Sequence, residues 1–325
     1  MIFTRPLLIP TLLAVWLGGC RPEKTDVVAE SAAILHQQPP DFIDQLSHLD
    51  ALAMGEKSGS WVHSTLADSL TLYREHLRPL LGLANSDSEK VNLLNAWIFD
   101  SLGVMPVTDT GDLATSLPSQ VLRNRQGSCL GISLLFLALG EALDMPLRPV
   151  FLPGHIFVRY RSKEYTRNVE TLRKGLDRSD SFYRDHFYLA RRPWYSLQEA
   201  ELGDALAALV FNLANTHRSR GKRDEALGEY RLVEEALPGF PEALGNEGAL
   251  LLEAGEISTS EGKLLVALAG DSLAEPAWRN LARIYREQGD TTKAAAWARL
   301  YLSTKILAVD DSRISSPLRI FTEAK

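Results

Sequence analysis

The spacing of apolar residues predicts two amphipathic helices in the first half of the chain. Over residues 61–81, and again over 86–102, apolar positions recur every three or four residues, as they do on one face of a helix. Ser86 and Glu89 form a capping-box pattern that begins the second helix, and Gly103 ends it. Each helix is therefore expected to place one apolar face against a core.

The period of the pattern changes in the middle of the chain. A long, uniformly apolar segment begins at Cys129 and ends near Pro146, which predicts a buried helix. Residues 147–172 are instead rich in Val, Ile, Phe and Tyr, with turn residues at 153–154 and 162–163. They predict two or three antiparallel strands. A helix followed by strands in one core indicates an α+β fold.

Beyond residue 200 the sequence repeats with a period of 34 residues, which separates Gly221, Gly255 and Gly289. Small residues recur at two further matched positions, namely Ala214, Gly248 and Ala282, and then Ala226, Ser260 and Ala294. This period resembles the tetratricopeptide repeat (TPR), in which paired helices touch through small residues. Each pair leaves an apolar face uncovered, so about three pairs must stack. Residues 196–325 are therefore expected to form an all-α TPR solenoid with a C-terminal cap.

The first twenty residues have the features of an export signal. Arg5 precedes an apolar run that is too short to span a bilayer, and small residues follow. The ending Leu17-Gly18-Gly19-Cys20 resembles the bacterial lipobox, whose cysteine is lipidated and becomes the first residue of the mature protein.

The resemblance to the lipobox implies a location. Residues 1–19 are expected to be a lipoprotein signal peptide, Cys20 to bind the membrane through its lipid, and the polar residues 20–60 to form a tether. No aspartate follows Cys20, which favours the outer membrane. The protein is expected to be anchored in the cell envelope and to face the periplasm.

Charge and cysteine content narrow the function classes. The chain carries 41 acidic and 35 basic residues, a formal net charge of −6, and no basic stripe, so nucleic acid is not an expected partner. It has two cysteines, and with Cys20 lipidated, Cys129 is the single free thiol. In an oxidising compartment such a thiol is open to oxidation or intermolecular pairing, unless it is buried or has a chemical function. No metal-ligand spacing or Gly-rich phosphate loop occurs, so no metal or other cofactor is expected.

Cys129 stands at a predicted helix start, where the helix dipole favours thiolate over thiol. The same position is also typical of a buried core cysteine. A nucleophilic thiol needs an imidazole and a third group that orients the ring. His155 opens a predicted strand soon afterwards, whereas His217 occupies a packing position in the first repeat. Strand alternation places Asn168 and Glu170 on one face, and either side chain could orient His155, with Glu170 preferred.

Residues 86–175 resemble the transglutaminase-like superfamily, through the segments "VLRNRQGSCLGISLLFLALGEAL", "LPGHIFVRY" and "VETLRKG". The resemblance implies a papain-like core over residues 61–195 with a catalytic triad. Carried over to this sequence, the triad is Cys129, His155 and Glu170, with Asn168 as the alternative third member. Bacterial proteins of this kind join the thiol domain to C-terminal TPR helices.

Two positions depart from the family pattern. Glu170 stands where the family usually has aspartate, and Leu130 stands where an aromatic residue often follows the cysteine. An oxyanion hole would use the backbone N–H of Cys129 and a second donor, for which Gln126 and Asn124 are candidates.

Two functions are compatible with these residues and repeats. The first is a thiol-dependent hydrolase (protease or amidase) or acyltransferase that acts on peptide or protein amides through a thioester at Cys129. In this case the TPR groove recruits a protein or peptide partner. The second is a catalytically inactive TPR scaffold that binds a protein at the cell envelope.

Overall fold

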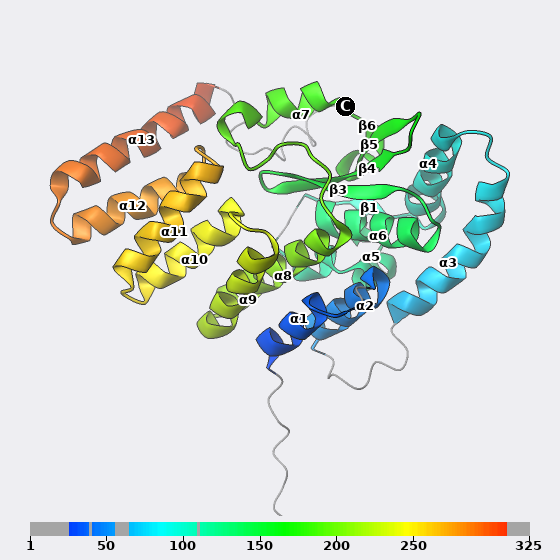
Figure 1. Ribbon diagram of the computed structural model, residues 1–325, viewed down its shortest axis with the longest axis horizontal. Helices are drawn as coiled ribbons and strands as arrows, with labels where there is room; N and C mark the ends of the chain where they lie inside the picture. The colour runs from blue at the N-terminus through cyan, green and yellow to red at the C-terminus, as the bar shows by residue number, and fades with distance from the viewer. Residues whose placement is uncertain (1–25, 39–40, 56–64, 109–110, 311–325) are drawn as a thin grey trace, which may run out of the picture.

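The structure is a computed structural model (Figure 1) that describes residues 26–38, 41–55, 65–108 and 111–310. The predicted signal peptide, the lipidation site Cys20 and residues 311–325 of the expected C-terminal cap (303–325) lie outside these ranges. Among the described helices, none combines the length and the apolar character that a membrane crossing requires.

The chain is mostly helical, with two small sheets in its central part. The elements before the repeats are α1 (Val27–Leu35), α2 (Phe42–Ala53), α3 (Thr65–Gly82), α4 (Asp87–Ala96), β1 (Met105–Pro106), α5 (Pro118–Asn124), β2 (Gln126–Gly127), α6 (Cys129–Ala142), β3 (Leu147–Leu152), β4 (His155–Arg161), β5 (Thr166–Glu170), β6 (Leu176–Asp177) and α7 (Asp180–His186). The amphipathic helices and the antiparallel strands predicted from the sequence are therefore confirmed. The second helix begins as predicted, since the Ser86 hydroxyl accepts the backbone N–H of Glu89 at 3.2 Å.

Helix α6 is the centre of the first part of the molecule. Every residue from Cys129 to Gly140 is buried, as expected for a helix that is apolar on all sides. It packs on β3 and β4 of an antiparallel sheet with the strand order β3-β4-β5-β6, and α3 and α5 contact it as well. In β3 and β4, Leu152 pairs with His155. His155 is therefore the first residue of β4, directly after the Pro-Gly turn.

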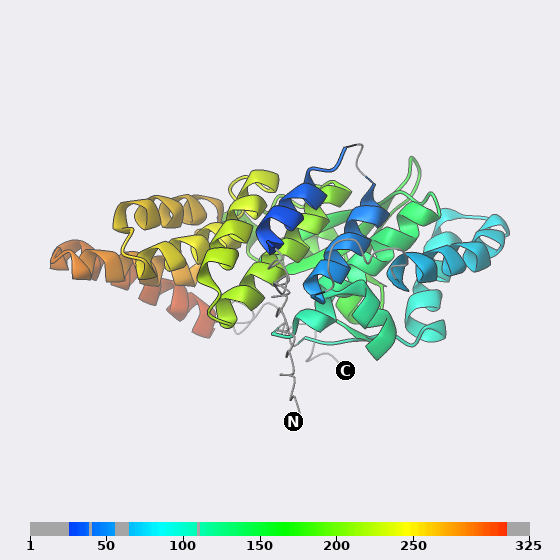
Figure 2. The same ribbon diagram turned by 90° about the horizontal axis from the view of Figure 1, so that it is seen from below.

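Residues 27–53 differ from the expected tether. Helices α1 and α2 lie against the body of the molecule, where α2 contacts both α6 and α8 (Figures 1 and 2). Leu46 and Leu49 are almost completely buried, and the carboxylate of Asp50 accepts the backbone N–H of Ser119 at 2.9 Å. Both helices are rich in apolar residues (VVAESAAIL and FIDQLSHLDALA), and these residues dock the helices on the body of the molecule.

The repeats form a row of antiparallel helix pairs that extends away from the sheet (Figures 1 and 2). Their helices are α8 (Leu202–Ser219), α9 (Arg223–Ala236), α10 (Pro241–Glu253), α11 (Ile257–Gly270), α12 (Glu275–Glu287) and α13 (Thr291–Asp310). The three glycines of the 34-residue period lie in the turn within each pair, with φ values of 73°, 82° and 80°. These positions need the left-handed backbone that glycine adopts without strain. The predicted helical repeat is therefore confirmed.

The first repeat shares its core with the thiol domain. One cluster of buried apolar residues runs from Phe42 to Leu250, and a second, smaller cluster spans Leu244 to Ile284. The domain boundary expected at 195–196 does not separate two cores, because α8 and α9 complete the first one.

Candidate active site at the start of helix α6

Cys129 is the first residue of α6, directly after the N-cap Ser128. The Ser128 hydroxyl accepts the N–H of Gly131 at 3.3 Å, and its backbone N–H donates to the carbonyl of Thr115 at 2.8 Å. A Cβ atom on Gly131 would lie 2.1 Å from that same carbonyl, so only glycine allows the chain to pass this close. The first N–H groups of a helix have no partner within it. Those of Cys129 and Leu130 therefore have no partner within α6 and lie at the helix start, where the thiol also is.

His155 and Glu170 meet next to this helix start. The imidazole Nε2 of His155 lies 3.0 Å from Oε2 of Glu170, and both side chains are fully buried. Since a carboxylate accepts hydrogen bonds, Nε2 donates. The other ring nitrogen, Nδ1, is then the one left for Cys129, and both residues line the same cavity. The structure thus brings together the three residues that the sequence predicted as a group.

The electrostatics of this group favour a charged imidazole. Burial by itself lowers the pKa of His155, but the charges of Glu170 and Cys129 and hydrogen bonds to both outweigh it and raise the pKa to about 10. His155 is therefore protonated at neutral pH. An imidazolium beside a cysteine at a helix start is the arrangement that a thiol nucleophile requires.

Glu170 is held by two further donors that the sequence pattern does not indicate. The Tyr183 hydroxyl donates to Oε2 at 3.0 Å, and the backbone N–H of Leu172 donates to Oε1 at 3.0 Å. Tyr183 lies on α7 and stacks on Phe157 with ring centroids 4.3 Å apart. Burial, followed by the charge of Glu170, raises the pKa of Tyr183 well above 10, so it remains a hydrogen-bond donor. The carboxylate is fixed in place by partners from β4, α7 and its own turn.

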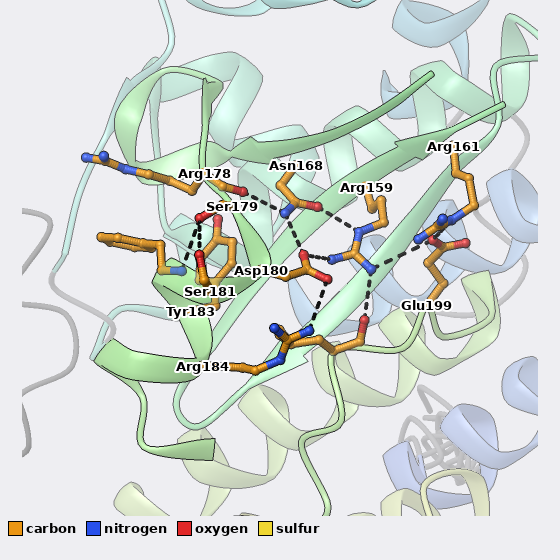
Figure 3. A network of polar contacts seen from close by, with 12 residues as sticks. Arg159, Arg161, Asn168, Arg178, Ser179, Asp180, Ser181, Tyr183, Arg184 and Glu199 are labelled. Carbon is orange, nitrogen blue, oxygen red and sulfur yellow. Dashed lines mark hydrogen bonds and ion pairs between the residues drawn. The ribbon is translucent and has the colours of Figure 1, made fainter. Parts of the chain in front are cut away.

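Asn168, the alternative third member, takes part in a different network (Figure 3). Its Oδ1 accepts from Nε of Arg159 at 2.7 Å, and its Nδ2 donates to the carbonyl of Arg178 at 2.6 Å and to Asp180 at 2.9 Å. Arg159 is buried and also bonds Asp180 and the carbonyl of Leu197. Asp180 is the first residue of α7, so this network holds on the sheet the helix that carries Tyr183.

A cavity of about 200 Å³ opens beside the thiol. Its walls come from two parts of the chain: Ser128, Cys129, Leu130, Phe151, Leu152, Gly154, His155 and Ile156 from the thiol domain, and Ala208, Phe211, Asn212, Asn215, Phe240 and Glu242 from α8 and the start of α10. The oxyanion candidates Gln126 and Asn124 are exposed and are not among the lining residues. No His, Cys, Asp and Glu cluster suited to a metal ion occurs in the part of the chain that the structure describes.

Comparisons with known proteins agree with this architecture. Residues 61–184 match the family described as "Transglutaminase-like superfamily", and residues 277–304 match "Tetratricopeptide repeat". The chain therefore contains a transglutaminase-like domain and, near its C-terminal end, a TPR. No curated protein sequence matches the chain.

Among solved structures, one of similar fold is described as "Crystal structure of menin reveals the binding site for Mixed Lineage Leukemia (MLL) protein". It is 14% identical, with a TM-score of 0.55, and the match covers 83% of this chain and 67% of that one. At this identity, the likeness concerns the fold alone.

Proposed function

We propose that this protein is a thiol enzyme that cleaves peptide or protein amides, or transfers their acyl groups, through a thioester at Cys129. The observation that carries the proposal is the buried group of Cys129, His155 and Glu170. Its first two members line a cavity. A cysteine that only filled the core would need neither a charged imidazole nor an adjacent cavity. The transglutaminase-like domain over 61–184 supports the same chemistry.

The first half-reaction releases the amine. The Cys129 thiolate attacks the amide carbonyl carbon, a C–S bond forms, and the carbonyl electron pair moves onto oxygen. The N–H groups of Cys129 and Leu130 can donate to that oxyanion. When the intermediate collapses, the C–N bond breaks and the His155 imidazolium gives its proton to the leaving nitrogen. A thioester and a neutral imidazole remain.

The second half-reaction releases the acyl group. Water, or a second amine, attacks the thioester carbon while His155 takes its proton. Collapse breaks the C–S bond and expels the thiolate, which restores the thiolate–imidazolium pair. Water gives a carboxylic acid and an amine gives a new amide. Glu170 keeps the imidazole in one orientation and stabilises its charge in both half-reactions.

The rate at which iodoacetamide alkylates Cys129 at different pH values tests this proposal. At pH 6 an ordinary thiol, with a pKa of about 8.5, is almost wholly protonated. We expect the wild-type protein to react rapidly at pH 6 and His155→Ala to react slowly. Equal, slow rates in both proteins would reject the thiolate–imidazolium pair and, with it, the proposed enzyme.

The repeats are proposed to recruit an acidic partner segment. A groove of about 720 Å³ lies along α10, α12 and α13 and is lined by alanines, by four arginines (Arg218, Arg279, Arg283 and Arg286) and by one carboxylate, Glu253, which pairs with Arg218. Arg279 and Arg286 are exposed and have no carboxylate partner among the described residues. This positive surface on a chain of net charge −6 is complementary to a segment that carries carboxylates.

Binding of a fluorescein-labelled octaglutamate, measured by anisotropy, tests the groove. We expect Arg279→Ala with Arg286→Ala to weaken binding at least tenfold. Replacing Arg123 and Arg125, exposed residues at the end of α5, should leave binding unchanged. An equal loss in both double variants would assign the binding to overall charge and reject the groove.

The second candidate function is a scaffold without catalysis. It is favoured by the likeness in fold to menin, whose structure is described by its binding site for the MLL protein, and by Glu170 and Leu130 at positions where the family usually differs. In this case the partner would bind to the repeats or to the cavity, and the alkylation profile of Cys129 would be that of an ordinary thiol.

We also propose that the protein is exported and attached to a membrane by a lipid on Cys20. The support is the lipobox-like sequence that ends at this residue. Metabolic labelling with an alkyne analogue of palmitate should mark the wild-type protein but not Cys20→Ala. Labelling that survives the substitution would reject Cys20 as the lipidation site.

A further inference from the structure

The cavity beside Cys129 is built jointly by the thiol domain and the first repeat. On one side are Phe151, Leu152 and Ile156 of the sheet, and on the other are Ala208 and Phe211 of α8 together with Phe240. The two sides are in direct contact, because Phe240 packs against Phe151 with ring centroids 6.4 Å apart. Phe240 also packs against Phe211 of its own side, at 5.4 Å. The repeat therefore supplies a fixed wall of the site.

Polar contacts hold this wall at the catalytic helix. Nδ2 of Asn212, on α8, donates to the hydroxyl of Ser116 at 3.0 Å, and that hydroxyl lies 3.1 Å from the hydroxyl of Ser128. Ser128 is the residue that caps α6 directly before Cys129. Next to His155, the N–H of Gly154 donates to Oε1 of Glu242, on α10, at 3.0 Å. Helix α8 of the first repeat thus holds the residues beside the thiol, and α10 of the second repeat holds the residue beside the imidazole.

The lining is apolar over most of its surface, and its size fits one side chain. An apolar cavity of about 150 Å³ accommodates a benzene molecule, so a cavity of about 200 Å³ accommodates a leucine, methionine or phenylalanine side chain. Glycine or alanine would leave most of this volume unfilled, and a larger group would exceed it.

The polar groups of the lining are already engaged within the protein. Oδ1 of Asn215 accepts from the Tyr230 hydroxyl at 2.7 Å and from Asn246 at 2.9 Å. The Glu242 carboxylate accepts from Gly154 and from the Tyr195 hydroxyl. Burial raises the pKa of Glu242. The one cation among the lining residues, His155, is already paired with Glu170 at 3.0 Å, so the desolvation of an acidic substrate side chain would be poorly compensated.

We infer that this cavity is a specificity pocket for one medium-sized apolar side chain of the substrate's acyl residue, and that α8 and Phe240 set its size. The inference rests on the proposed acyl chemistry at Cys129, since it places the acyl group within reach of that thiol. It assigns to the first repeat a role in substrate choice, in addition to any partner binding by the later repeats.

The test compares N-acetyl aminoacyl chloromethyl ketones that carry leucine, phenylalanine, alanine, glutamate or lysine. The thiolate displaces chloride, so an S–C bond forms as the C–Cl bond breaks, and mass spectrometry of the intact full chain gives the rate constant. The reactions are run at pH 9, where even an ordinary thiol is mostly ionised. Selectivity is therefore measurable whether or not Cys129 is activated. Iodoacetamide at pH 6 tests the proposed function separately.

In the wild-type protein we expect the leucine and phenylalanine probes to react at least tenfold faster than the alanine and glutamate probes. Ala208→Leu fills the pocket and should reduce this preference below twofold. Ser219→Leu adds the same side chain at an exposed position of α8 and should leave both the preference and the rate with iodoacetamide as in the wild type. Phe211→Ala enlarges the pocket and should shift the preference toward phenylalanine, which keeps the test valid if Ala208→Leu does not fold.

Three results would overturn the inference. One is equal rates for the five probes in the wild-type protein. Another is a preference for leucine that survives both pocket variants. The third is a preference for lysine, which would assign recognition to the Glu242 carboxylate instead.

Discussion

Replacing Glu170 with glutamine tests the electrostatic argument for the site. The change keeps the shape of the side chain but removes the charge that faces Nε2 of His155 at 3.0 Å. The partners of His155 raise its pKa from 6.5 to about 10. One pKa unit corresponds to about 1.4 kcal/mol, so the net preference for the imidazolium, after the opposing effect of burial, is about 5 kcal/mol. Glu170 is the largest favourable contributor.

If Glu170 supplies about half of that preference, its charge is worth about 2–3 kcal/mol. The thiolate–imidazolium pair would then be roughly 30- to 150-fold less populated in Glu170→Gln. We expect the alkylation rate of Cys129 by iodoacetamide at pH 6 to fall by that factor. At pH 9 the rates should approach each other, because an ordinary thiol is mostly ionised there.

A matched control lies in the first repeat. His217 and Glu229 form another buried pair, with Nδ1 2.8 Å from Oε2. Glu229→Gln makes the same chemical change in a pair that does not line the cavity. It should reduce stability but leave the alkylation profile unchanged. If Glu170→Gln alkylates at the wild-type rate at pH 6, Glu170 does not hold the imidazole in its charged form and the reasoning fails.

The pH dependence of stability gives an independent measurement on the same variant. The pKa of His155 is higher in the folded chain, so its protonation stabilises the fold. That contribution is complete below about pH 6.5 and is lost as the pH rises through about 10. The difference in unfolding free energy between wild type and Glu170→Gln, from urea titrations, should therefore be larger at pH 6 than at pH 10. A difference that does not change with pH would contradict this.

Three further substitutions test the surroundings of the site. Tyr183→Phe removes one donor to Glu170 and should lower the unfolding free energy by about 1.5–3 kcal/mol and slow alkylation at pH 6; rates equal to wild type would limit Tyr183 to packing. Arg159→Met breaks the buried network of Figure 3 and should cost about 3 kcal/mol by urea titration, whereas a neutral result would make the network dispensable. Leu46→Ala, in α2, should cost about 2–5 kcal/mol; a value near zero would restore the view of residues 20–60 as a tether.

The local parts of the site could be predicted from the sequence because they depend on neighbours in the chain. The position of Cys129 follows from a helix start, and that of His155 from a Pro-Gly turn before a strand. The choice between Asn168 and Glu170 depends on which side chain reaches the imidazole. Strand alternation alone places both on one face, and the deciding contact requires the register between β4 and β5.

The non-local parts could not be predicted in this way. Tyr183 reaches Glu170 because α7 folds back over the sheet, and no periodicity in one sequence indicates such a return. Nothing in the repeat pattern distinguishes Phe240 and Glu242 from other repeat residues. Their contacts with the site arise only where the start of α10 meets the thiol domain. The docking of α2 depends on its contacts with α6 and α8, which are distant in the sequence, so no local pattern distinguishes this helix from a helix within a tether.

The shared core makes a last prediction about how the molecule unfolds. The cluster from Phe42 to Leu250 includes both the thiol domain and α8 and α9, while the later repeats rely on the smaller cluster from Leu244 to Ile284. Segments that share a core open together, and segments with fewer buried contacts open at a lower free energy. In hydrogen exchange of the full chain, amides of α8 and α9 should therefore be protected to the same degree as those of α6, and amides of α12 and α13 should exchange sooner. If α8 and α9 exchange with α12 and α13 instead, the repeats unfold as a separate unit, and the first repeat is not an integral wall of the site.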